Sequence, residues 1–188
     1  MKSFLFFNPV DRYFDIEITN YNHTHRQESI DTVGNRYRDK LAQCIRQRYL
    51  RNGFSIHYAL LNDDHISSKM AVPPDKIMRS SMNSLAQIAL EQEGEEYHMD
   101  NKELLSQLGP TDEIMVSGFH SDCVDYFAEF AYNSGIKTMV DDDLLENFLY
   151  WSRQPGFRTD IFPSVKLPEE QLVMIRMGRA GKPWLWQH

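Results

Sequence analysis

The sequence predicts an α/β domain in which a mostly parallel sheet carries helices on both faces, a three-layer, Rossmann-like arrangement. Short apolar runs alternate along the chain with stretches whose apolar residues recur at three- and four-residue spacings. Glycines close several of these stretches and keep the connections short. Such alternation is typical of strand–helix–strand units, which build parallel sheets. The 188 residues are 41% hydrophobic, enough for one sizeable core, so we expect a single domain over residues 1–188.

Each predicted element follows from its local pattern. The apolar runs expected to form strands are Phe4–Phe7, Phe54–Leu61, Asp112–Ser117, Ile136–Val140 and Leu172–Met177. The amphipathic stretches expected to form helices are Asn35–Leu50, Lys76–Glu91, Lys102–Leu108, a segment from Ser121 or Asp122 to Ser134-Gly135, and a segment capped by Asp143 with Glu146. Residues 11–27 are polar and aromatic without a clear period, so a loop is expected there.

Composition narrows the function classes. A net charge of −7 argues against nucleic acid or an anionic membrane as the main partner. The apolar run near the N-terminus is too short for a signal peptide core or a membrane span. Two cysteines without framework spacing favour a reducing, cytoplasmic compartment. A small molecule is therefore the expected partner.

The stretch from Ile114 to Val124 carries the clearest chemical pattern. An apolar strand ends in Gly118, the chain turns, and a helix begins with Cys123 in its first turn. The positive end of a helix favours a thiolate over a thiol, so Cys123 is a candidate nucleophile. A small core residue is the alternative interpretation of this cysteine. Cys44 lies in the middle of a helix on its apolar face and is expected to be core.

This pattern resembles the isochorismatase-like cysteine hydrolases, which include the nicotinamidases. The resemblance rests on the run from Gly118 through Cys123 and Val124, the amphipathic helix after it, Gly135, an apolar strand and Asp141. It implies the isochorismatase-like hydrolase fold, with functional groups at the carboxyl ends of the strands. It also implies a thioester intermediate on Cys123, with oxyanion and substrate contacts from the turn before it. The residues of that turn are Phe119, His120, Ser121 and Asp122. Relatives commonly form dimers or tetramers, so the resemblance implies a homo-oligomer.

The family's catalytic set also contains an Asp at the end of the first strand and a Lys from the middle of the chain. Alignment on Phe4–Phe7 puts Asn8 at the position of the Asp, and Asn cannot accept a proton at neutral pH. Asp11 lies three residues further on and is the candidate carboxylate. Lys76 has about the expected separation from Cys123 and is the candidate cation.

The second predicted strand ends in a possible metal motif. Asp63 and His65 are similar to the Asp-x-His of nicotinamidases, which binds a divalent ion such as Zn, Fe or Mn beside the substrate. Metal sites need further ligands or water, and an exposed polar loop is the simpler interpretation. No cofactor is required by the predicted thioester chemistry.

Three functional hypotheses follow. The first is a hydrolase that cleaves the C–N bond of a small amide through a Cys123 thioester. The second is a catalytically degenerate protein of the same fold that acts as a binding or interaction module. The third is an isochorismatase-type hydrolase of a non-amide substrate without covalent catalysis. Asn8 separates the first two, because it alters the catalytic set.

Overall fold

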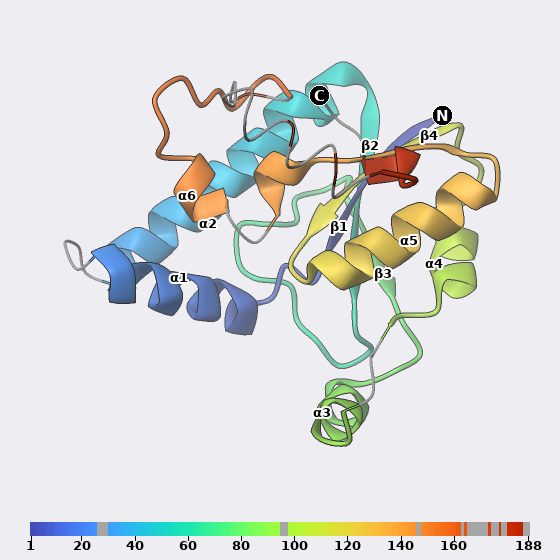
Figure 1. The fold of residues 1–188 in the computed structure, drawn as a ribbon, viewed down its shortest axis with the longest axis horizontal. Helices are drawn as coiled ribbons and strands as arrows, with labels where there is room; N and C mark the ends of the chain where they lie inside the picture. The colour runs from blue at the N-terminus through green and yellow to red at the C-terminus, as the bar shows by residue number, and fades with distance from the viewer. Residues whose placement is uncertain are drawn as a thin grey trace.

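A parallel sheet forms the centre of the molecule in the computed structural model, which describes residues 1–25, 30–94, 98–145, 148–162, 164, 173, 177 and 180–185. In this part of the chain the sheet has five strands, all parallel, in the order β3-β2-β1-β4-β5 (Figure 1). The strands are β1 (Lys2–Phe7), β2 (Phe54–Leu60), β3 (Lys76–Arg79), β4 (Glu113–Gly118) and β5 (Lys137–Val140). The predicted α/β class with a parallel sheet is confirmed.

Helices cover both faces of the sheet, which gives three layers (Figure 1). The helices on one face are α1 (Asp11–His25), α2 (Ile30–Arg48) and α6 (Phe148–Trp151), and those on the other are α4 (Asn101–Leu108) and α5 (Ser121–Asn133). A further helix, α3 (Ser84–Gln92), lies apart from these layers (Figure 1). Among the described residues, no helix combines the length and the apolar character that a membrane crossing requires.

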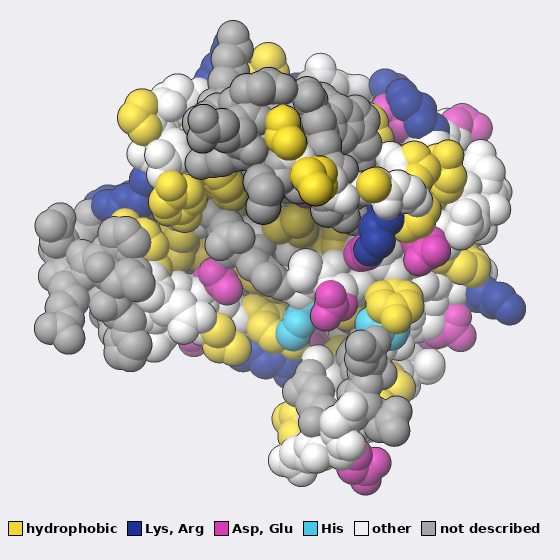
Figure 2. Space-filling view, in the orientation of Figure 1, with side chains coloured by type: hydrophobic (Ala, Val, Ile, Leu, Met, Phe, Trp, Pro, Cys, Tyr) yellow, Lys and Arg dark blue, Asp and Glu magenta, His cyan; other side chains and the backbone are white. Residues whose placement is uncertain are grey.

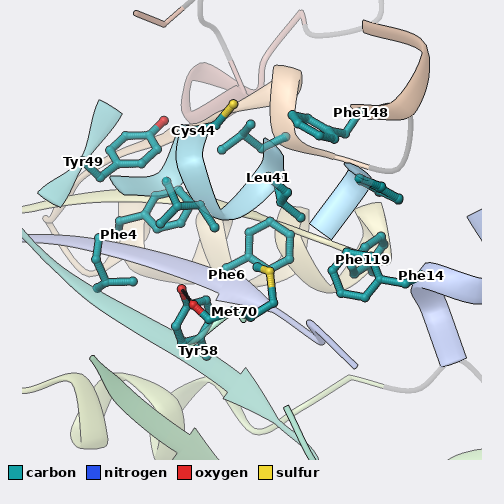
Figure 3. Close-up of a cluster of buried hydrophobic side chains, with 14 of the residues drawn as sticks. Phe4, Phe6, Phe14, Leu41, Cys44, Tyr49, Tyr58, Met70, Phe119 and Phe148 are labelled. Carbon is teal, nitrogen blue, oxygen red and sulfur yellow. Dashed lines mark hydrogen bonds between the residues drawn. The ribbon is translucent and has the colours of Figure 1, made fainter. Parts of the chain in front are cut away.

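The central strand β1 is buried on both faces, as expected for a parallel sheet under two helical layers. Because side chains alternate along a strand, Phe4 and Phe6 face α2 while Leu5 and Phe7 face α5. Figure 3 shows the first of these cores, an aromatic cluster between the sheet and α2. In this core Phe4 stacks on Tyr49 with ring centroids 4.0 Å apart.

Two elements of the sheet and of the helical layer differ from the sequence prediction. The loop predicted over residues 11–27 was wrong, because α1 occupies Asp11–His25. Phe14 and Ile18 lie one helical turn apart and are both buried against α2. The single helix predicted over Lys76–Glu91 was also wrong. Residues Lys76–Arg79 pair with β2 as the edge strand β3, and α3 begins only at Ser84.

The end of the chain also departs from prediction. Asp143 does not cap a helix; instead Asp141 caps a short 3₁₀ turn, Asp142–Leu144, by accepting a hydrogen bond from the Asp143 N–H. Glu146, the proposed capping-box partner, lies outside the described residues. The strand predicted over Leu172–Met177 also lies mostly outside them, and the two described residues within it, Val173 and Met177, are helical.

Candidate functional site

The sheet reverses its winding between β1 and β4, which makes this point the candidate site. From β1 the chain adds β2 and β3 on one side, and β4 and β5 lie on the other. In open parallel sheets, ligands bind at the carboxyl ends of the strands where the order reverses. Asn8 follows β1 here, and the turn from Gly118 to Cys123 follows β4. We call this region the switch point.

The β4–α5 turn depends on an unusually close approach of two backbones. Gly118 has φ +146°, and a Cβ atom at this residue would lie 2.5 Å from the backbone nitrogen of Phe7. The next backbone contact is a hydrogen bond of 3.1 Å from the Phe119 N–H to the Phe7 carbonyl. Only glycine fits this position, so the Gly of the sequence motif has a steric role.

His120 starts the helix that carries Cys123. It is the N-cap residue of α5, it adopts the left-handed conformation with φ +67°, and its side chain does not cap the helix. The prediction that Ser121 or Asp122 would cap α5 was therefore wrong, because both lie inside the first turn. Cys123 is the third helical residue, 7% exposed, at the edge of the core beneath α5. The first turn is where backbone N–H groups lack partners within the helix.

Asn8 lies beside this turn at the end of β1. Its backbone N–H donates to the Ala59 carbonyl at 2.9 Å, and its φ of +54° turns the chain away from the sheet. The side chain is 2% exposed, and its Oδ1 makes no hydrogen bond to the described residues. A buried acceptor without a donor is costly, so this oxygen is a candidate contact for a ligand N–H group.

A second group of polar side chains, which we call the edge cluster, joins four elements at this edge. Its members are Arg12, Tyr13, Asp64, Gln87 and His120. Arg12 Nη2 donates to Asp64 Oδ2 at 2.9 Å, and it is 3.4 Å from both Gln87 Oε1 and the Tyr13 hydroxyl. The Tyr13 ring meets the His120 ring edge-on at 4.4 Å. Burial raises the pKa of Asp64, and the Arg12 charge partly offsets this shift.

The edge cluster was only partly visible in the sequence. His120 was among the residues of the turn expected to contact the substrate. The Tyr13 ring packs against the neighbouring Phe119 ring, 6.1 Å away in a stacked arrangement. Arg12 and Gln87 were missed, because Arg12 lay in a segment predicted to be a loop and Gln87 in the middle of a predicted longer helix. Figure 2 shows histidine side chains beside acidic and hydrophobic ones on the face between α5 and α3.

The structure places Asp11 in a different set of contacts. Its carboxylate accepts hydrogen bonds from Arg38 Nε and Nη2, at 3.2 and 3.0 Å, and from the Ser67 hydroxyl. The side chain is largely exposed. These contacts tie α1 to α2 and to the loop after β2, so Asp11 has a structural role in this state.

Lys76 is likewise separated from the carboxyl ends of the strands. It is the first residue of β3, it pairs in register with His57, and its ammonium group donates to the Gln107 carbonyl. The cation at the carboxyl end of β3 is Arg79. Its Nη1 donates to the carbonyls of Leu61, Asn62 and Asp64, at 3.1, 2.9 and 2.8 Å. Arg79 therefore holds the loop that carries Asp64.

Neither of the two residues predicted to bind a metal, Asp63 and His65, is part of a metal site among the described residues. Asp63 accepts hydrogen bonds from the backbone N–H and hydroxyl of Ser84, at 2.7 and 2.6 Å, which lower its pKa. Asp63 thus fixes the start of α3, and His65 is exposed. Within the described ranges, no group of three or more His, Cys, Asp or Glu side chains could hold a metal ion.

The end of β5 holds a fully buried ionic group, the Arg48 cluster, made of Arg48, Tyr49, Asp141 and Asp143. Arg48 Nη1 is 3.1 Å from Asp141 Oδ2 and 3.0 Å from Asp143 Oδ2, and the Tyr49 hydroxyl donates to Asp141. Burial raises the pKa of Asp141 to about 7, against the opposing effect of Arg48. Arg48 Nη2 also donates to the Arg158 carbonyl at 2.8 Å. The Arg48 cluster therefore anchors the segment after α6 to the sheet.

Comparison with protein-family models, curated proteins and solved structures found no match. The parallel α/β fold is established by the structure, and the resemblance to cysteine hydrolases continues to rest on the residues around Cys123.

Proposed function

We propose that this chain hydrolyses the C–N bond of a small amide and that Cys123 is its nucleophile. The observation that carries the proposal is the position of Cys123, in the first turn of α5 at the switch point of the sheet. A thiolate is favoured at a helix N-terminus, and the backbone N–H groups there are suited to hold an oxyanion.

The reaction would proceed in two steps. The Cys123 sulfur attacks the amide carbonyl, the tetrahedral oxyanion is held at the start of α5, and the C–N bond breaks to leave a thioester and a free amine or ammonia. Water then attacks the thioester, which releases the acid and restores the thiol. The amine needs a proton to leave, and the thiol must lose one to attack.

His120 is the residue that we propose for this proton transfer. It precedes Cys123 by three residues in the same turn, and histidine titrates near neutral pH. Asn8 cannot accept a proton, and Asp11 and Lys76 are engaged by Arg38, Ser67 and Gln107. A proton carrier within the turn replaces the pair that the family resemblance implies.

Asn8 supports an amide as the substrate class. Its buried Oδ1 makes no hydrogen bond to the described residues and would accept one from the N–H group of a bound amide. Arg12 supplies further donors, because its hydrogen bonds to described residues all use Nη2. Its Nε and Nη1 would bind a carbonyl or carboxylate oxygen of the substrate.

The test is ammonia release from a panel of small primary amides by the full chain, together with acid-quench mass spectrometry for an acyl adduct on Cys123. We expect Cys123→Ala to abolish both signals and Cys44→Ala to preserve them. We expect His120→Gln to slow turnover about a hundredfold or more, because positioned acid–base groups contribute on that scale. Undiminished turnover by Cys123→Ala would overturn the proposal.

A binding module without turnover is the second candidate. It is favoured by Asn8 at the position of the base and by the engagement of Asp11 and Lys76 in other contacts. The same amide panel distinguishes the two. Binding without ammonia release or adduct, weakened by Asn8→Ala, would favour this second function over hydrolysis.

A further inference from the structure

The side chain of His120 makes an aromatic contact and does not cap α5. Its backbone φ is +67°, and the side chain makes no capping hydrogen bond to the first turn of the helix. The imidazole ring meets the ring of Tyr13 edge-on, with centroids 4.4 Å apart and planes at 90°. Tyr13 lies in the first turn of α1, so this contact joins the helix after β1 to the turn after β4.

The Tyr13 ring is itself packed against the aromatic core. It stacks on Phe119 with centroids 6.1 Å apart and planes 22° from parallel. Phe119 is buried and packs edge-on against Phe6 and Phe14, at 5.7 and 4.9 Å, and it lies beside Phe14 in Figure 3. The guanidinium carbon of Arg12 lies 4.9 Å from the centroid of the Tyr13 ring. A ring packed between other side chains has few alternative orientations, so Tyr13 presents a fixed surface at the switch point.

The Tyr13 hydroxyl is held from another direction. It accepts hydrogen bonds of 3.4 Å from Arg12 Nη2 and from Gln87 Nε2, and Gln87 is a buried residue of α3. The ring contacts His120, whereas the hydroxyl contacts Arg12 and Gln87. Replacing Tyr13 by Phe therefore removes only the hydroxyl contacts, and replacing it by Leu removes the ring contact as well.

We propose that Tyr13 is a positioning residue, whose ring fixes the imidazole of His120 for proton transfer between the Cys123 thiol and the leaving amine. This role rests on the hydrolysis proposed above, in which His120 carries the proton. Proton transfer needs its two heavy atoms within about 3 Å of each other, so an imidazole free to turn would spend much of its time out of reach. Tyr13 thus has the orienting role of the carboxylate in a Ser-His-Asp triad, but it acts through packing and not through charge.

The first measurement follows the His120 ring directly and does not depend on turnover. NMR relaxation and relaxation dispersion of the ring carbons in the ¹³C-labelled full chain report motion from picoseconds to milliseconds. We expect a rigid ring in the wild type and in Tyr13→Phe, and in Tyr13→Leu either an order parameter below about 0.6 or exchange broadening. Tyr21→Leu, which removes another partly buried aromatic ring from α1, is the matched control and should leave His120 rigid.

The second measurement is the kinetics of amide hydrolysis. We expect Tyr13→Leu to lower kcat about tenfold or more and to leave KM within about twofold, because a misplaced catalytic group slows the chemical step without weakening binding. Tyr13→Phe and Tyr21→Leu should both stay within about twofold of the wild type in kcat and KM. Since Tyr13 acts through His120, Tyr13→Leu should cause little further loss in the His120→Gln variant.

A rigid His120 ring in Tyr13→Leu would overturn the proposal, as would losses that add in the double variant. A raised KM with unchanged kcat would also overturn it, because Tyr13 would then act by contacting the substrate. An equal loss from Tyr13→Phe would do the same, since the hydroxyl and not the ring would then matter. If the wild-type chain hydrolyses no amide, the proposed hydrolysis fails by itself, and the ring dynamics alone decide whether Tyr13 fixes His120.

Discussion

The switch point and the Arg48 cluster contain similar residues but differ in how deeply those residues are buried. Each has an arginine–aspartate pair at the end of a strand, with a cysteine in the same region. In the Arg48 cluster the charged groups are buried, and Arg48 pairs with two carboxylates while Tyr49 donates to Asp141. At the switch point Arg12 is 36% exposed and the Asn8 acceptor has no donor among the described residues. Arg48 Nε also makes no hydrogen bond to the described residues, so the difference lies in solvent exposure. Buried charge pairing indicates a structural role, and an exposed edge beside an unsatisfied acceptor indicates a binding site.

The two cysteines show the same contrast. Cys44 lies in the middle of α2, where burial raises the pKa of its thiol to about 12. A thiol with such a pKa is almost entirely protonated at neutral pH and is a poor nucleophile. Cys123 is nearly as inaccessible to solvent, yet it occupies the first turn of a helix at the edge of the sheet. We therefore expect the position of a cysteine relative to the helix N-terminus, and not burial alone, to determine which of the two thiols is the better nucleophile.

The two regions should differ most in the free energy of unfolding that is lost when Arg48 or Arg12 is replaced. Arg48→Met leaves Asp141 and Asp143 buried without their cation, so we expect it to lower the free energy of unfolding by about 3 to 5 kcal/mol. Arg12→Met removes a pair that is partly exposed and should cost about 1 kcal/mol or less. Urea unfolding followed by circular dichroism measures both. Equal losses would contradict the distinction between the two regions.

The pH dependence of stability provides the second test. The pKa of Asp141 is raised to about 7 in the folded state, above its value of about 3.9 in the unfolded chain. The folded state therefore holds more protons between these values, and the stability contributed by this group is present below pH 4 and lost as the pH rises through about 7. We expect a loss on the order of 4 kcal/mol over this range, since the pKa differs by about 3 units and each unit corresponds to about 1.4 kcal/mol.

Asp141→Asn removes the titrating group and should flatten this part of the stability profile, whatever its effect on absolute stability. The measurement is urea unfolding at a series of pH values from 4 to 8 for both proteins. Parallel profiles would show that Asp141 stays ionised throughout and does not titrate in this window.

Two glycines provide a third comparison, with a smaller effect. Gly118→Ala forces a Cβ atom against the backbone of Phe7, and we expect it to lower the free energy of unfolding by about 2 to 3 kcal/mol. Gly135→Ala, at φ +82° with nothing within 4 Å of its Cβ, should cost about 1 to 2 kcal/mol from backbone strain alone. Similar losses would mean that the Gly118 contact relaxes easily and does not constrain the turn before Cys123.

Much of the fold could be predicted because its elements carry local patterns. The strands β1, β2, β4 and β5 are short segments rich in apolar residues, and α4 and α5 have apolar faces followed by glycine. By contrast, β3 has only four residues, too few to show a period, and its assignment depends on pairing with β2. Helix α1 was missed because its aromatic, Asn and Thr residues have modest helix propensity, although Phe14 and Ile18 keep the helical spacing.

The candidate site was predictable only where it is local. The turn from Gly118 to Cys123 is continuous in sequence, and the structure places it at the carboxyl edge of the sheet as expected. The edge cluster brings Arg12, Asp64 and Gln87 together from three elements distant in sequence, which no spacing rule encodes. Asp11 and Lys76 were chosen by separation along the chain, and separation says nothing about which way a side chain turns.

The most direct test of the central claim, that Cys123 is the reactive thiol, is the rate at which each cysteine is alkylated. The native full chain is treated with limiting iodoacetamide at pH 7, quenched over time, digested and analysed by mass spectrometry for both cysteine peptides. We predict that Cys123 reacts more than about a hundredfold faster than Cys44, because the Cys44 thiol is almost fully protonated. Slow modification of both cysteines at comparable rates would contradict the account.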